Sequence, residues 1–212
     1  MTQTIQQVLG DYVMFYRDQY PVEQLVPGTT LEKSVEVVNQ NLRKDRNILN
    51  WSAGLQDEAA RLLWVNWIYQ RLGAEPIRKP ILAHDVQGRL HVDCGDTRLM
   101  ALNLLIDPGT VSVVVSVPST QAANYQDWYP VKSNADLIEL AEFGPGASVL
   151  LRTNSDGRVE WLEIGDRTTA HHLHDIDQRV RMMQNYLANQ PADFVFSVDW
   201  ARSYINWENY IN

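Results

Sequence analysis

The spacing of apolar residues along the chain predicts helices that alternate with short strands. Apolar positions three or four residues apart indicate a helix, and a short apolar run between turn residues indicates a strand. The segments with helical spacing are Ile5–Gln19, Thr30–Asn41, Asp57–Leu72, Thr97–Leu105, Ala135–Phe143, Asp175–Asn189 and Asp199–Tyr210. The strand-like segments are Ile81–His84, Leu90–Asp93, Val111–Val117, Ser148–Thr153 and Val159–Ile164. This order predicts an α+β fold with a small mixed sheet, a helical N-terminal segment, and a C-terminal hairpin followed by helices.

The order of these elements divides the chain into two parts. Residues 1–134 hold the helical segment and the central strands, and residues 135–212 hold the hairpin and the last helices. The segment 124–134 is the best candidate for a seam, but it lacks the Pro-, Gly- or Ser-rich composition of a linker. We therefore expect the C-terminal part to pack on the same domain as the first part.

Composition narrows the class of protein. The chain has 18 Lys and Arg against 26 Asp and Glu, a formal net charge of −8, which opposes non-specific binding to nucleic acid. Its single cysteine, Cys94, excludes an intrachain disulfide framework and suits a reducing compartment. The first residues lack the pattern of a signal peptide, and no apolar run is long enough to span a membrane. These features predict a cytoplasmic protein.

The stretch Arg89–Leu105 carries the most specific chemistry in the sequence. It has the pattern of a strand, a glycine turn and the first turns of a helix, an arrangement that aims backbone N–H groups at an anion. Gly95 permits the tight turn, Asp96 or Thr97 can cap the helix, and Arg98 can offer a planar fork to phosphate or carboxylate. The candidate ligand- or phosphate-binding residues are therefore Gly95, Asp96, Thr97 and Arg98.

Two other interpretations of this stretch stay open. In the first, the helix is capped by Asp96 and Arg98 is paired with Asp93 or Asp96, so that the turn is only structural. In the second, Asp93 and Asp96 supply oxygen ligands to magnesium. The neighbouring Cys94 is either a thiol made reactive by the helix N-terminus or a small buried residue at the strand end.

The central segment resembles the ParB-like domain of the ParB/sulfiredoxin superfamily, over about residues 62–117. Members of this family show a helix, a P-I strand, a hairpin to a second strand, a G-x-x-R turn at a helix start, and a V-x-V-x-V strand. Here Pro80-Ile81 matches the P-I element, and Gly95 and Arg98 match the turn. The resemblance implies a small mixed sheet of ParB/sulfiredoxin-like type and a phage or plasmid origin.

The sequence departs from the family pattern at two positions. Partition-type members that bind CTP have two adjacent arginines, and this chain has Thr97-Arg98 in their place. Sulfiredoxins place a catalytic cysteine two residues before the arginine, where this chain has Asp96, while Cys94 comes two residues too early. A sulfinic-acid reductase is therefore not expected.

The half-kept family motif, the negative net charge and the aromatic C-terminal residues together predict a ParB-like accessory protein that acts through protein–protein contacts or self-association, with a nucleotide or other anion at the Gly95–Arg98 turn. The cofactor stays open; a nucleotide with magnesium is the candidate. The alternative is a metal-dependent nuclease or nucleotide hydrolase in which Asp96 and Arg98 are catalytic and Asp93 and Asp96 hold the metal.

Two further clusters have a structural and a functional interpretation. His172 and His174 alternate with Leu173 and could bind a transition metal, although a polar loop is the simpler interpretation. The C-terminal aromatic residues have helical spacing, which predicts either a packing face for the last helix or an exposed partner surface. These residues are Trp200, Tyr204, Trp207 and Tyr210.

Overall fold

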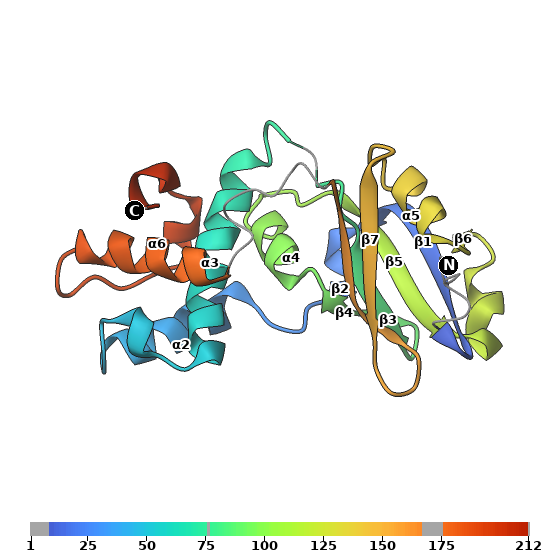
Figure 1. The fold of residues 1–212 in the computed structure, drawn as a ribbon, viewed down its shortest axis with the longest axis horizontal. Helices are drawn as coiled ribbons and strands as arrows, with labels where there is room; N and C mark the ends of the chain where they lie inside the picture. The colour runs from blue at the N-terminus through green and yellow to red at the C-terminus, as the bar shows by residue number, and fades with distance from the viewer. Residues whose placement is uncertain (1–8, 76, 167–175, 212) are drawn as a thin grey trace. The chain divides into compact units, whose positions relative to one another are not determined.

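The computed structural model describes residues 9–75, 77–166 and 176–211. It has a mixed α+β architecture, and its elements form two compact units (Figure 1). The first unit comprises Met1–Gly28, Ile77–Leu99 and Asp107–Ala170, and the second comprises Thr29–Pro76, Met100–Ile106 and His171–Asn212. The units therefore interleave along the sequence. The C-terminal hairpin belongs to the first unit, whereas the following helix belongs to the second.

The first unit is built on a mixed sheet that has six strands within the described residues, in the order β2-β4-β3-β5-β1-β6. Its strands are β1 (Tyr12–Pro21), β2 (Leu25–Val26), β3 (Ile81–Val86), β4 (Arg89–Cys94), β5 (Thr110–Pro118) and β6 (Tyr129–Val131). The pairs β2/β4 and β3/β5 are parallel, and the other neighbours are antiparallel. β5 lies between β3 and β1 and is buried on both faces of the sheet. This position explains why its sequence is an almost unbroken apolar run.

A two-stranded hairpin and a short helix cover one face of this sheet. The hairpin consists of β7 (Ala147–Thr153) and β8 (Val159–Asp166), and the helix is α5 (Asn134–Leu140). Buried residues of these elements pack against Met14, Leu82 and Val114 of the sheet. The hairpin turn is held by the Asn154 side chain, whose Oδ1 accepts hydrogen bonds from the backbone N–H groups of Asp156 and Arg158, both at 3.0 Å. The predicted C-terminal hairpin over Ser148–Thr153 and Val159–Ile164 is confirmed.

The second unit is helical. Its helices are α2 (Leu31–Leu42), α3 (Ala53–Arg71) and α6 (Ile176–Ala188), and the short 3-10 helices η2 (Ile48–Asn50), η5 (Asp199–Arg202) and η6 (Trp207–Tyr210) complete it. Thr30 caps α2, because its hydroxyl accepts a hydrogen bond from the Lys33 N–H at 3.3 Å. Within this unit, buried residues of α2, α3 and α6 form one core with Trp200 and Trp207. A further helix, α4 (Asp96–Leu102), begins in the first unit.

The prediction of an N-terminal helix over Ile5–Gln19 is wrong for the described residues, which form β1 from Tyr12. Gly10 has φ +55°, a left-handed conformation that stops a helix at this point. The following Tyr-Val-Met-Phe-Tyr run is aromatic and β-branched, as strands prefer. β1 lies between β5 and β6, and its successive residues Met14, Phe15 and Tyr16 are all buried, so its apolar run imitates the spacing of a helix.

The prediction of a single last helix over Asp199–Tyr210 is also wrong, since this segment forms η5 and η6 with a non-helical stretch between them. The buried side chain of Asn66 on α3 is the cause. Its Nδ2 donates to the carbonyls of Ala201 at 3.1 Å and Ser203 at 2.8 Å. Its Oδ1 accepts from Trp207 Nε1 at 2.8 Å and from Gln70 Nε2 at 2.5 Å. These bonds replace the backbone bonds that a continuous helix would need.

Asn66→Leu is expected to destabilise the protein by about 3 kcal/mol, because it leaves the buried Ala201 carbonyl and the buried Trp207 indole N–H without partners. Urea denaturation followed by tryptophan fluorescence measures the change. The matched control is Ser34→Ala, because Ser34 is buried and its hydroxyl has no hydrogen-bond partner in the described part of the chain. The control is expected to be neutral or slightly stabilising. Equal effects of the two substitutions would contradict the anchoring role of Asn66.

Candidate functional site

The glycine turn after β4 has the geometry that the sequence predicts. β4 ends at Cys94, and Gly95 has φ +123°, which strongly favours glycine. A Cβ atom at Gly95 would lie 2.5 Å from Ile81 Cδ1 and 2.9 Å from Arg98 Nη2. The Arg98 side chain therefore folds back over the turn, and the close packing requires glycine for a second reason.

The Asp96 carboxylate is occupied by the backbone of another segment. Its Oδ1 accepts a hydrogen bond from the Gly28 N–H at 2.9 Å, and a Cβ atom at Gly28 would lie 3.0 Å from Oδ2. Asp96 thus ties the chain before α2 to the start of α4. Thr97 follows it and is partly exposed.

Arg98 lies against the start of β3. Its Nη1 donates hydrogen bonds to the carbonyl of Lys79 and to that of Pro80, the latter at 2.8 Å. Of the open interpretations, the pairing of Arg98 with Asp93 or Asp96 is not observed, since Arg98 turns toward backbone carbonyls instead. Burial lowers the pKa of the Arg98 guanidinium, while the nearby Cys94 and the Glu163 carboxylate act in the opposite direction. An arginine nevertheless keeps its charge at any physiological pH.

Lys79 is the residue that sequence reasoning missed. Its Nζ forms an ion pair with the Glu163 carboxylate of β8, and both side chains are partly exposed. Burial is the main cause that lowers the pKa of Lys79, and the positive charge of Arg98 lowers it further, whereas Glu163 raises it. Two cations therefore lie close enough to repel each other, and Glu163 is the carboxylate that faces both among the described residues.

This arrangement supplies an incompletely neutralised positive charge beside the Gly95 turn. Among the described residues, Nη1 of Arg98 bonds to two backbone carbonyls, the guanidinium also has a hydrogen bond with the Cys94 side chain, and a guanidinium has five N–H donors in all. Lys79 adds a second positive charge close to Arg98, and this charge is paired with Glu163. Arg98 and Lys79 thus share one carboxylate, Glu163, among the described residues.

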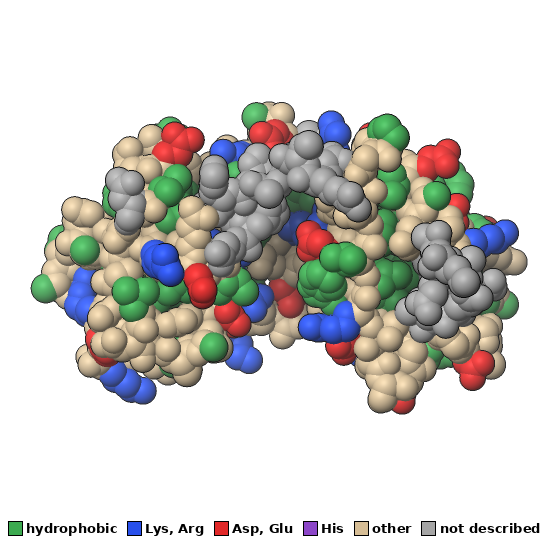
Figure 2. All heavy atoms as spheres, viewed as in Figure 1, with side chains coloured by type: hydrophobic (Ala, Val, Ile, Leu, Met, Phe, Trp, Pro, Cys, Tyr) green, Lys and Arg blue, Asp and Glu red, His purple; other side chains and the backbone are tan. Residues whose placement is uncertain are grey.

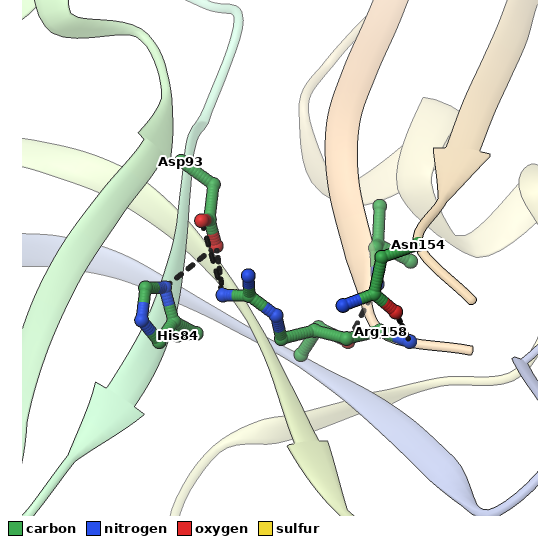
Figure 3. Close-up of polar contacts among 6 residues, drawn as sticks. His84, Asp93, Asn154 and Arg158 are labelled. Atoms are coloured by element: carbon green, nitrogen blue, oxygen red, sulfur yellow. Dashed lines mark hydrogen bonds and ion pairs between the residues drawn. The ribbon is translucent and has the colours of Figure 1, made fainter. Parts of the chain in front are cut away.

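A second polar network lies on the face of the sheet that the hairpin covers (Figure 3). Asp93 Oδ2 is 2.8 Å from His84 Nδ1, and Arg158 Nη1 lies 3.1 Å and 3.2 Å from the two oxygens of Asp93. Figure 3 shows the Arg158 side chain reaching from the hairpin turn, which Asn154 holds, toward Asp93 on the sheet. The network therefore fastens the hairpin to β3 and β4. It also fixes the orientation of the His84 ring through Nδ1, whereas Nε2 takes no part in this network.

The predicted metal ligands do not form a cluster. Asp93 bonds to His84 and Arg158, and Asp96 bonds to Gly28. In the described ranges, no group of three or more His, Cys, Asp or Glu side chains is arranged to hold a metal ion. His172 and His174 lie outside the described residues. Cys94 is partly exposed, and its Sγ lies 3.7 Å from the Leu162 carbonyl.

The C-terminal aromatic residues pack inside the second unit. Trp200 and Trp207 are buried, and the Trp200 indole donates a hydrogen bond to the Tyr186 hydroxyl at 2.9 Å. Tyr210 packs on the same core, whereas Tyr204 is 84% exposed. The packing interpretation of this group is confirmed for every member except Tyr204.

Comparison of the chain with protein-family models, with curated proteins and with solved structures finds no match. The ParB-like resemblance of residues 62–117 therefore stays an expectation. No helix of the described part is both long and apolar enough to cross a membrane.

Asp93→Asn is expected to destabilise the protein by about 2 kcal/mol, because it leaves the half-buried Arg158 guanidinium without its counter-charge. Urea denaturation measures the loss. The matched control is Asp156→Asn in the exposed hairpin turn, which is expected to change stability by less than about 0.5 kcal/mol. If both variants unfold at the same urea concentration, the network does not fasten the hairpin.

Proposed function

We propose that this chain is a ParB-like accessory protein that binds a phosphate-bearing ligand or another small anion at Arg98 and Lys79 and acts through a protein partner. The observation that carries the proposal is the close approach of these two cations, with Glu163 as the carboxylate that neutralises them. A nucleotide, with or without magnesium, is the ligand class that combines this charge with the family resemblance.

The chemistry of the two side chains suits a phosphate. Arg98 is oriented by its bonds to the Lys79 and Pro80 carbonyls, so little side-chain entropy is lost when its other N–H groups bind an oxygen. Lys79 carries a point charge on a flexible stem and can follow the ligand. An anion here would relieve the repulsion between the cations and raise the pKa of Lys79 toward its usual value.

The Glu163 carboxylate would compete with a bound anion for Lys79. It lies on β8, so a ligand anion that replaces it at Lys79 would also release one contact between the hairpin and the sheet. Ligand binding would in this way alter the hairpin, which is a route by which a bound anion can change a protein-binding surface.

A metal-dependent nuclease or nucleotide hydrolase is the second candidate. It receives less support, because the carboxylates of Asp93 and Asp96 are engaged with His84, Arg158 and Gly28. The observation in its favour is the His84–Asp93 pair, which orients an imidazole as catalytic bases are oriented.

Duplex nucleic acid is a less suitable partner than a protein. The net charge is −8, and on the face drawn in Figure 2 the basic side chains are scattered among acidic and polar ones. A protein that coats nucleic acid needs a continuous basic surface, which supplies most of its affinity.

Isothermal titration calorimetry with CTP, ATP, GTP and inorganic phosphate, each with and without magnesium, tests the proposal. We expect at least one of these anions to bind. Lys79→Gln should weaken its binding about tenfold, which corresponds to about 1.4 kcal/mol. Glu163→Gln should strengthen binding, because it removes the internal competitor.

Lys132→Gln is the matched control, since Lys132 is an exposed lysine of the same unit. It should leave the affinity unchanged. Failure of the wild type and of Glu163→Gln to bind any of these anions at millimolar concentration would overturn the proposal. So would binding that is the same in Lys79→Gln and in the wild type.

A further inference from the structure

We infer that the second unit carries a self-complementary surface around Tyr204, through which two copies of this chain form a symmetric dimer. The surface consists of Tyr204 and the two concavities that border it. It belongs wholly to the second unit, so the inference does not depend on the anion site.

Tyr204 is an exposed ring on a fixed backbone. The carbonyl of Ser203 accepts a hydrogen bond from Asn66 at 2.8 Å, and the N–H of Ile205 donates to Gln70 Oε1 at 3.4 Å. Both neighbours of Tyr204 are thus bound to α3, while 84% of Tyr204 itself is exposed. A large aromatic side chain presented by a fixed backbone loses little entropy on binding, and tyrosine is enriched among the residues that dominate interfaces.

A concavity on each side of Tyr204 is large enough for such a ring. The first has a volume of about 440 Å³, and its lining includes Tyr69, Leu72, Leu105 and Arg202. The second has a volume of about 450 Å³. Its lining includes Trp67, Arg71, Ile205, Asn206 and Glu208. Gln70 and Tyr204 line both, so the two concavities form one surface with the ring between them.

The charges of this surface favour a second copy as its occupant. Arg71 and Glu208 line the same concavity, so the surface carries both signs of charge. The guanidinium of Arg71 is held over the Trp67 ring, 3.7 Å from its centroid, which fixes the position of the positive charge. A strongly acidic or basic partner would meet one repulsive group here. In the proposed twofold dimer, Arg71 of one copy would face Glu208 of the other, and each Tyr204 would enter a concavity of its partner.

Sedimentation equilibrium of the full chain over a range of concentrations tests this inference. We expect a reversible dimer, and Tyr204→Ser should raise its dissociation constant about tenfold or more. The matched control is Tyr129→Ser, because Tyr129 is an exposed tyrosine of the other unit, at 62%. It should leave the dissociation constant unchanged. Circular dichroism checks that each variant is folded.

A charge exchange tests the symmetry. Arg71→Glu and Glu208→Arg should each weaken the dimer, and the double variant with both substitutions should restore it. A chain that is monomeric at all concentrations would overturn the inference. A dimer that resists Tyr204→Ser, or a double variant weaker than both single variants, would overturn it as well.

Discussion

The first unit depends on the contact between Arg98 and the start of β3. The guanidinium bonds to the carbonyls of Lys79 and Pro80, and Gly95 makes room for it because any Cβ atom would collide there. This contact fixes the turn between β4 and α4 against the neighbouring strand. It also brings a second cation, Lys79, beside the first. Arg98 therefore both stabilises the turn between β4 and α4 and belongs to the proposed anion site.

The charges around Arg98 favour anion binding over metal-dependent catalysis. The site around Arg98 combines two cations, one carboxylate and a thiol, and the proposed anion would have to displace Glu163. The Asp93 network has the opposite character, because the Asp93 carboxylate is already bonded to His84 and Arg158. It serves the attachment of the hairpin. An anion-dependent binding protein is consistent with both arrangements.

The sequence predicted the central elements well, because their signals are local. Gly95 marks a tight turn, and the β-branched run of β5 indicates a strand. Distant contacts decide the elements that were predicted wrongly. Asn66, more than 130 residues away in the chain, breaks the last helix into two turns. Lys79 could not be assigned to the site from the motif, because only the pairing of β3 with β4 brings it to Arg98.

The pKa of the Lys79 ammonium, measured by nuclear magnetic resonance on lysine labelled at Cε, tests the central claim most directly. Because burial and Arg98 disfavour the charged form, the pKa should lie below the usual value of about 10.5. It should fall further in Glu163→Gln and rise when inorganic phosphate or a nucleotide is added. A pKa at or above the usual value, unchanged by Glu163→Gln and by every anion, would contradict the account.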